Sequence, residues 1–408
     1  MMIPVLLLSF IWGFFVHRDH IFPYSILQLI APVSADENSV RKVIQSTSTR
    51  QGLLHSLPYV AGTVDKKYKK SGVLQYEKGQ AFEGYNFFHS GLKPLAKLVD
   101  MNGITIHEWA LPGHEWHHVE LLPNGDIIVV AYENSLMRLN RDSQLIWRHD
   151  GLFHHNAHVT DNGQIYAIVR KEIQVDEIHP TNAIYDDIIL EFSMDGEMTA
   201  EFSILEVVSD SQYEFLLPSV QDLPFPDTKN GAHEVLDIIH TNHIEVFDGS
   251  LAAMSDLFRK GNMLISMRNL NAIAILDGST RKIIWLWGPT NLVFQHQPVL
   301  LNNGHILVFN NGVKKSSIIE MNPMANSIVW RYAPDEGFFS ITRGSNQKLP
   351  NGNVLITESN TGHVFEVTES KDRVWHYANP DFTEDGERVF IWRMTRFVPE
   401  ELDFLGQT

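Results

Sequence analysis

Histidine is the residue type whose number and spacing most suggest chemistry in this sequence. There are 20 histidines among 408 residues, and several come a few positions before a turn that contains Asn and Gly. Such positions are His155 ahead of Asn162-Gly163, His240 with Asn242 ahead of Gly261-Asn262, and His296 ahead of Asn303-Gly304. Arg268 follows the apolar run at residues 264–267, and Arg343 precedes Asn351-Gly352. If these segments meet in space, two or three imidazoles and a guanidinium converge on one point.

Such a cluster has a clear chemical use. A neutral imidazole is a good nucleophile near neutral pH, because its ordinary pKa is about 6.5. It can attack a sulfate ester and hold the sulfuryl group covalently. The transferred group is anionic, so an arginine and imidazole N–H donors would stabilise it, as in phosphoryl transfer. This chemistry requires neither a metal nor a nucleotide cofactor.

Composition removes several other classes of function. The formal net charge of −17 argues against a nucleic-acid partner, because phosphate backbones are bound by clustered Lys and Arg. The absence of cysteine removes thiolate nucleophiles, disulfides and Cys-ligated metals. The phosphate loop GxxxxGK(S/T), the dinucleotide motif GxGxxG and the nucleophile elbow GxSxG are also absent. Nucleotide-dependent sulfotransfer on an α/β fold is therefore not expected.

Two alternating repeats indicate the elements that must position the histidines. The first is a turn with Gly beside Asn followed by an apolar run, at residues 122–129, 161–168, 260–266, 302–308 and 349–356. Asn-Gly tolerates the positive φ angles of tight hairpins, and the apolar run supplies the next strand. The second is a short strand, a polar turn and another strand, which occurs six times. Five of the six end near Trp109, Trp147, Trp285, Trp330 and Trp375. We expect these tryptophans to pack between neighbouring sheets.

The repeats predict an all-β fold, a six-bladed β-propeller. Successive turns lie about 40–50 residues apart, which is the period of a four-stranded blade. The first strand of each blade lines the central channel, so the residues before the Asn-Gly turns should face it. The segment 171–259 is longer than one blade needs, and its Pro-rich part at 217–227 is expected to be an insertion loop. The predicted boundaries are 71–400 for the propeller and 401–408 for a C-terminal tail.

The N-terminus predicts export. Residues 3–16 are almost entirely apolar, which is short for a membrane span but suits the hydrophobic part of a signal peptide. Val33-Ser34-Ala35 has the small-residue spacing of a cleavage site. Residues 1–35 are therefore predicted to be a signal peptide or membrane anchor, and 36–70 a linker. The expected location is periplasmic or otherwise outside the cytoplasm, with a buried helix docked on the domain as the alternative.

The ordered motifs of the propeller region resemble those of the arylsulfotransferase family. They include Asp237-Ile238-Ile239-His240-Thr241-Asn242, Ser266-Met267-Arg268-Asn269, Gln295-His296, Leu349-Pro350-Asn351-Gly352-Asn353 and Phe153-His154-His155-Asn156. The resemblance covers roughly residues 75–400 and lies in the order and spacing of the motifs. It implies nucleotide-independent transfer of sulfate from an aryl sulfate donor to a phenolic acceptor, without a cofactor. The sequence departs from the family pattern at Asn310, where an Asp-Asn pair is usual, and at Ile318, where an Arg is common.

The resemblance also implies roles for particular residues. His296 would be the sulfated nucleophile, while His240, Arg268 and His155 would bind the sulfuryl oxygens or assist the leaving phenolate. The substrate-binding residues that it implies are Asn242, Gln295, His154 and Arg343. His154, His158, His117 and His118 compete with His155 for its role, and we expect the pair His117-His118 to be mostly structural.

Two other functions remain open at this point. One is a non-catalytic exported propeller that serves as a binding or scaffold module, because fold alone does not imply activity. The other is a metal-dependent enzyme that uses the histidine cluster as ligands. A quinone-dependent propeller dehydrogenase is a weaker alternative.

Overall fold

The structure is a computed structural model that describes residues 62–63, 70–91, 93–218, 235–334 and 338–406. The predicted leader at 1–35, most of the linker at 36–70 and most of the Pro-rich segment at 217–227 lie outside these residues. None of the helices in the described ranges is long and apolar enough to cross a membrane.

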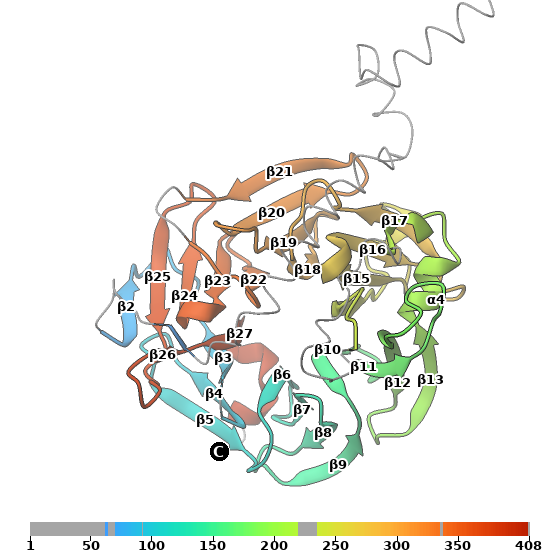
Figure 1. Cartoon of the computed structure of the whole chain (residues 1–408). Coiled ribbons are helices and arrows are strands. Elements are labelled where there is room, and N and C mark those ends of the chain that lie inside the picture. Colours follow the sequence, from blue (N-terminus) through green and yellow to red (C-terminus); the bar gives the residue numbers. More distant parts are fainter. Residues whose placement is uncertain (1–61, 64–69, 92, 219–234, 335–337, 407–408) are drawn as a thin grey trace, which may run out of the picture.

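Six antiparallel sheets surround one axis in the described part of the chain, as the repeats predict (Figure 1). Blade 2 contains β6 (Trp116–Leu121), β7 (Ile127–Ala131), β8 (Ser135–Leu139) and β9 (Leu145–Asp150). Blade 3 contains β10 (Phe153–Val159), β11 (Ile165–Ile173), β12 (Ile184–Phe192) and β13 (Met198–Ser203). Blade 4 contains β14 (Thr241–Val246), β15 (Met263–Met267), β16 (Ala272–Leu276) and β17 (Ile283–Trp287). Blade 5 contains β18 (His296–Leu300), β19 (Ile306–Asn310), β20 (Ser317–Asn322) and β21 (Ser327–Tyr332).

The remaining two blades join the ends of the described chain. Blade 6 contains β22 (Ser345–Lys348), β23 (Val354–Glu358), β24 (His363–Val367) and β25 (Arg373–Ala378), with β2 (Gly72–Tyr76) as a fifth, outer strand. Blade 1 consists of β3 (Tyr85–Ser90), β4 (Leu95–Val99) and β5 (Thr105–Ala110), and its inner strand is the C-terminal β27 (Ile391–Phe397). Early and late segments therefore share two sheets, which closes the ring without a covalent bond. The six-bladed prediction is confirmed.

The tryptophans on outer strands link neighbouring blades. The indole N–H of Trp109 donates to the backbone oxygen of Gly125 at 2.9 Å, and that of Trp147 donates to Met194 at the same distance. Trp375 bonds in the same way to Met101, from blade 6 to blade 1. Each ring thus fills a gap between twisted sheets while its one polar atom is satisfied by the next turn.

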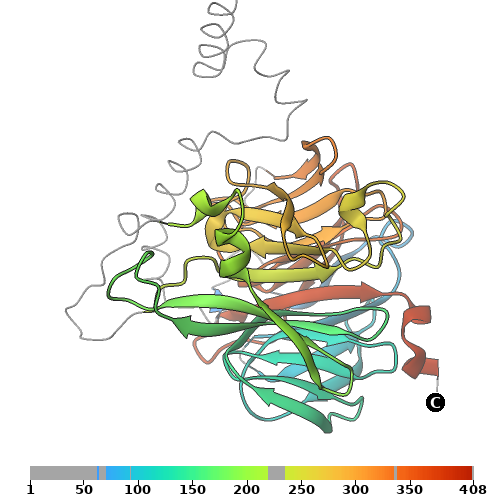
Figure 2. The ribbon, with the colours of Figure 1, turned by 90° about the vertical axis from the view of Figure 1, so that its right-hand side faces the viewer.

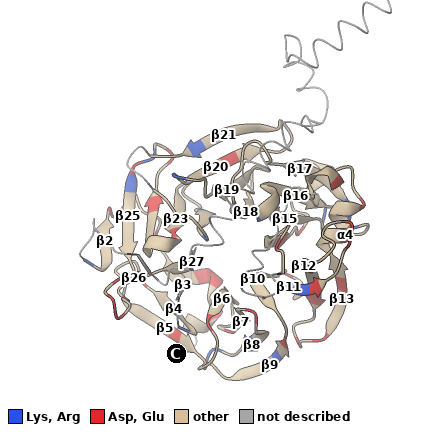
Figure 3. Ribbon diagram, viewed as in Figure 1, with Lys and Arg blue, Asp and Glu red and all other residues tan. Residues whose placement is uncertain are grey.

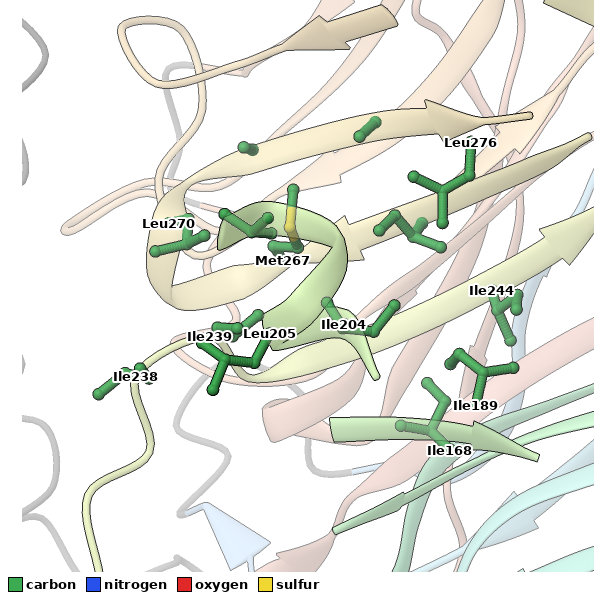
Figure 4. Close-up of a cluster of buried hydrophobic side chains, with 14 of the residues drawn as sticks. Ile168, Ile189, Ile204, Leu205, Ile238, Ile239, Ile244, Met267, Leu270 and Leu276 are labelled. Carbon is green, nitrogen blue, oxygen red and sulfur yellow. The ribbon is translucent and has the colours of Figure 1, made fainter. Parts of the chain in front are cut away.

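Apolar side chains fill the spaces between blades. The cluster between blades 3 and 4 brings Ile168 and Ile189 against Ile244 and Met267 (Figure 4). Each fully buried side chain of this size stabilises the fold by roughly 1.5–3 kcal/mol. The short helix α4 (Ile204–Ser209) extends the same cluster.

The segment after β13 and the C-terminus lie toward opposite faces of the disc (Figure 2). Helix α4 is capped by the Ser203 side chain, which accepts from the Glu206 N–H, and it is followed by the 3₁₀ turn η1 (Glu214–Leu216). At the other face, η6 (Pro399–Glu401) and η7 (Asp403–Gly406) follow β27. Phe404 of η7 is buried beside Trp109, at 6.0 Å between ring centroids, so the residues predicted as a tail pack on the propeller.

The remaining elements of the described chain are short. The two-residue strand β1 (Gly62–Thr63), which falls in the predicted linker, pairs with β26 (Arg388–Val389). Three further 3₁₀ turns are η3 (Asp256–Phe258), η4 (Arg268–Leu270) and η5 (Ser359–Thr361).

Candidate active site on the propeller axis

The candidate site lies on the axis, where the inner strands begin. A cavity of about 50 Å³ opens there. Its lining comes from all six inner strands or the residues just before them: His117, His118, His155, Asn156, Asn242, His243, His296, Gln297, Arg343, Gly344, Ser345, Trp392 and Arg393. Among the residues predicted from the sequence, His155, Asn242, His296 and Arg343 line this cavity. His154, His240, Arg268 and Gln295 lie behind them.

The backbone at this end of the channel is irregular in every blade that supplies a predicted residue. His155, His240 and Arg343 have left-handed φ values of 58°, 56° and 62°, which are uncommon for residues other than glycine. Inner strands β10, β14 and β18 each carry a register shift at the same end. Such bulges re-aim side chains, and strained backbone of this kind concentrates at functional sites.

His296 is oriented by hydrogen bonds to one of its two ring nitrogens. Nδ1 lies 2.7 Å from Oδ1 of Asn311 and 3.0 Å from the backbone oxygen of Phe294. The Asn311 amide nitrogen donates to the backbone oxygens of Ser340 and Arg343, which fixes its Oδ1 toward the ring. Because both partners of Nδ1 are acceptors, Nδ1 carries the proton and Nε2 keeps its lone pair. Nε2 is therefore the ring atom that could act as a nucleophile.

The surroundings of His296 also keep its ring neutral. Burial, together with the charge of Arg268, lowers the pKa of His296 to about 3, against the smaller opposing effect of the Asn311 hydrogen bond. Arg268 is buried with its guanidinium 4.7 Å above the Phe294 ring, and it donates to Asn269 Oδ1 at 2.8 Å. A guanidinium is thus held next to a neutral imidazole, which is the pairing needed for attack on an anion.

The lowered pKa of His296 predicts that the reaction rate stays nearly constant as the pH falls below neutrality. If the protein accepts 4-nitrophenyl sulfate and His296 is the nucleophile, as the family resemblance implies, the single-turnover rate of nitrophenol release should change less than about twofold between about pH 8 and pH 5, whereas an imidazole of ordinary pKa would lose roughly 30-fold. Asn311→Asp places a negative charge at Nδ1 and raises the pKa, so the rate of that variant should fall as the pH is lowered. A wild-type rate that drops with a midpoint near the ordinary value would contradict the assignment.

Three imidazoles lie in a row that begins behind the cavity wall, and the middle one, His155, lines the cavity itself. His154 Nδ1 lies 2.7 Å from His155 Nδ1, and His155 Nε2 lies 3.2 Å from His240 Nε2. At the outer ends stand two carboxylates. His240 Nδ1 is hydrogen-bonded to Asp237 Oδ2, and His154 Nε2 lies 3.1 Å from Asp187 Oδ1, although its N–H is not aligned on that oxygen.

Arg170 holds the two carboxylates in place. Its Nη2 donates to Asp237 Oδ2 at 2.7 Å and its Nε lies 3.7 Å from Asp187 Oδ1. Arg170 on β11 pairs in register with Asp187 on β12, where basic and acidic residues stand side by side (Figure 3). Although burial raises the pKa of Asp237, His240 and Arg170 more than offset it and hold that carboxyl ionised. Our sequence reasoning missed Arg170, Asp187 and Asp237, although Asp237 lies three residues before His240 in a quoted motif.

Asn242 and Gln295 connect blades 4 and 5 through a hydrogen bond. The Asn242 amide donates to the Gln295 backbone oxygen at 2.8 Å. The Gln295 side chain is fully buried, and its amide nitrogen contacts Ser266 Oγ and the backbone oxygens of Met267 and Ala272. Any effect of Gln295 on a substrate would therefore act through its neighbours Asn242 and His296.

Arg343 and His117 line the part of the cavity that blades 6, 1 and 2 supply. The Arg343 guanidinium lies 4.0 Å from the Phe390 ring centroid and 4.2 Å from that of Trp392. His117 is 4.2 Å from Trp392 and stacks on Tyr132, so one member of the pair expected to be structural contributes an aromatic surface to the cavity.

His118, His158 and the two departures from the family pattern, Asn310 and Ile318, make their contacts with residues other than His296. His118 lies 3.2 Å from Glu120. His158 lines a separate, larger groove near the Asn-Gly turns. Asn310 Oδ1 accepts from the Val293 N–H, and Ile318 is buried in β20. It is Asn311 that contacts His296.

No cluster of three or more His, Asp or Glu side chains within the described ranges is arranged to hold a metal ion.

Solved structures with a similar fold are only distantly related to this chain. One is a protein of unknown function from Bacteroides caccae, with 13% identity over 76% of this chain and 100% of that chain and a TM-score of 0.49. A virginiamycin B lyase from Staphylococcus aureus has 12% identity over 65% and 70% of the two chains and a TM-score of 0.37. The β-propeller domain of Cps50 (Swd1) from Myceliophteria thermophila has 9% identity over 77% and 91% and a TM-score of 0.45. Likenesses this weak carry no argument about function.

A family comparison is more specific. No curated protein sequence matches the chain. The family model of the arylsulfotransferases, however, matches residues 118–380, which is more than half of the chain and includes His155, His240, Arg268 and His296. The resemblance noted in the motifs is thereby confirmed, and the chain belongs to the arylsulfotransferase family.

Proposed function

We propose that this protein is a nucleotide-independent aryl sulfotransferase that works through a sulfohistidine at His296. The observation that carries the proposal is the state of that imidazole. Asn311 and the Phe294 carbonyl hold Nδ1–H, burial keeps the ring neutral, and the ring lines the axial cavity. A buried neutral imidazole with one committed nitrogen is a nucleophile rather than a general acid.

The charges around the cavity suit a sulfate ester. Arg268 stands beside His296, and Arg343 lines the same cavity. In the first half-reaction His296 Nε2 forms a bond to sulfur while the bond from sulfur to the aryl oxygen breaks. Charge spreads over the three sulfuryl oxygens, and donors fixed in a buried site stabilise it without reorganisation. We assign Arg268, His240 and Asn242 to these oxygens.

The two substrates would be small aromatic molecules. An aryl sulfate donor and a phenolic acceptor would use the cavity in turn, because the sulfuryl group is held on the protein between them. The aromatic surface of Trp392 and His117 is suited to stack on an aryl ring, and the Arg343 guanidinium packs against the Trp392 ring.

Incubation with 4-nitrophenyl sulfate tests this function. With phenol present, the purified protein should release nitrophenolate and form phenyl sulfate. Without phenol it should release about one equivalent and gain the mass of one sulfuryl group, as a covalent intermediate requires. Absence of release above a protein-free control, over a broad panel of aryl sulfates, would overturn the proposal in favour of a non-catalytic propeller.

A further inference from the structure

A second groove opens at the other end of the channel from the axial cavity, where the inner strands end. Its volume is about 330 Å³. Pockets for small organic molecules begin at roughly 300 Å³, so the groove can hold one. Its walls come from the last residues of β10, β14 and β18 and from the turns that follow these strands. We call it the distal groove, and the proposed sulfotransfer makes no use of it.

Glu245 marks the inner end of the distal groove. His243, two residues earlier in β14, lines the axial cavity, and alternate residues of a strand face the same way, so both side chains face the channel. The residues on either side of Glu245 are buried in the core between blades 3 and 4. Glu245 itself is half-buried, whereas the other two carboxylates of the groove, Asp161 and Asp248, are exposed at its rim.

The Glu245 carboxylate has no cationic partner within the described ranges. Its Oε2 accepts from the Leu300 N–H at 2.9 Å, while Oε1 makes no hydrogen bond to a described residue and remains open to the groove. Burial raises the pKa of Glu245 to about 7, and the Leu300 N–H and the charge of Arg393 offset this only in part. Arg393 lies 4.0 Å from Glu120 instead. Since an ionised carboxylate in such surroundings is costly without a nearby positive charge, Glu245 is suited to a cation that comes from outside the chain.

The rest of the lining suits an organic cation. Val159, Leu251 and Leu300 are half-buried, so part of each apolar side chain remains available to a ligand. Three carboxylates face one lysine, Lys260, so the groove is negative once Glu245 is ionised. No three carboxylates or imidazoles of the described residues are gathered in the way that a metal ion requires. A ligand with one positive group and an apolar body fits this lining.

We propose that the distal groove binds a small organic amine, whose ammonium group pairs with Glu245 Oε1 and whose apolar part packs on Val159 and Leu251. The ammonium group supplies the charge that the carboxylate lacks, and hydrogen bonds between charged partners are stronger than those between neutral ones. The apolar part gains by leaving water. The proposal does not depend on the sulfotransfer, because the groove and the axial cavity share no lining residue.

The test is isothermal titration calorimetry at about pH 8 with three probes of one shape: benzylamine, benzyl alcohol and benzoate. Benzylamine should bind one to one and at least about tenfold more tightly than benzyl alcohol, and benzoate should not bind. Glu245→Gln should weaken benzylamine at least about tenfold and change benzyl alcohol less than about twofold. Glutamine keeps an oxygen for the Leu300 N–H, so this variant should retain the fold.

Asp248→Asn is the matched control. It removes a negative charge from the same groove, but at an exposed position, where solvent screens the charge. Its Oδ1, which accepts from the Ser250 N–H and Oγ, is retained in asparagine. This substitution should weaken benzylamine less than about threefold.

The pH dependence of binding to the wild type is a second measurement that needs no variant. Benzylamine stays charged between about pH 6 and pH 8, whereas the Glu245 carboxyl loses its proton around its raised pKa of about 7. Because the complex needs the ionised carboxylate, the affinity should rise about tenfold over this range, and Glu245→Gln should remove the rise. Burial lowers the pKa of His158, so that ring stays neutral throughout. The other charged groups around Glu245 are Asp161, Asp248, Lys260, Glu120 and Arg393.

Three results would overturn the proposal. They are equal affinity for benzylamine and benzyl alcohol, binding of benzylamine that Glu245→Gln leaves unchanged, and no saturable binding of either benzylamine or butylamine up to about 10 mM. His296→Ala should bind benzylamine as the wild type does. Since no sulfate ester is present in these titrations, their failure would leave the proposed sulfotransfer untouched.

Discussion

His296→Ala is expected to abolish covalent sulfation and to slow transfer from 4-nitrophenyl sulfate at least about 10³-fold, because it removes the atom that forms the bond to sulfur. The loss should appear in kcat rather than only in KM. Binding of the anion by Arg268 and Arg343 does not need the imidazole, so the substrate can still enter. Intact-protein mass spectrometry after incubation with donor alone provides the most direct measurement.

Two controls separate lost chemistry from lost structure in this variant. His158→Ala removes another histidine of the channel, one that lines the groove at the far end of the inner strands, and it should remain sulfated at His296. Imidazole added to His296→Ala can occupy the vacated space and should restore part of the nitrophenol release. Sulfation of His296→Ala at the wild-type rate would refute the assignment of the nucleophile.

The fold could be predicted from the sequence because its signals are local. Each of the five Asn-Gly turns and the apolar run after it lie within about eight residues, and the strand–turn–strand motif that alternates with them occurs six times, once for each blade. The closing strand β27 is different, since its partner β3 lies some 300 residues earlier and no local pattern pairs them. Propeller closure could be expected in principle, but the register could not.

The site could be predicted only in part, because the inner strands do not keep a simple alternation. The register of β18 shifts between His296 and Val299, so neighbouring side chains are not sorted strictly to opposite faces. Gln295 was predicted to bind substrate, yet its amide is used inside the protein, whereas His117 was expected to be structural and lines the cavity. A single sequence contains no marker of such a bulge.

The groups that set the chemistry of the imidazoles come from other strands. Asn311 follows β19, and Arg170 and Asp187 belong to β11 and β12, all distant in sequence from the rings they contact. The effect of each of these residues depends on which ring nitrogen it contacts, and only the folded structure shows those contacts. The family resemblance predicted His296 as the candidate nucleophile, whereas the tautomer of its ring could be inferred only from the structure.

The largest expected effect on stability is at the closure of the ring. Arg396 on β27 and Glu366 on β24 form an ion pair in which both side chains are completely buried. Arg396 also donates to Asn86 Oδ1 and the Phe82 backbone oxygen, each at 2.8 Å. Glu366 in turn accepts from the Phe82 N–H and the Asn353 amide. This pair ties the C-terminal strand of blade 1 to blade 6.

Glu366→Ala should therefore destabilise the fold by about 3–5 kcal/mol, because it leaves the Arg396 charge buried without its partner. Urea unfolding followed by tryptophan fluorescence measures the change. Glu108→Ala, which breaks the exposed pair with Lys97, should cost less than about 1 kcal/mol. The double variant Glu366→Met with Arg396→Met should be more stable than Glu366→Ala, because no charge is then left unpaired. If Glu366→Ala unfolds at the wild-type urea concentration, ring closure must depend on the strand pairing of β27 rather than on this ion pair.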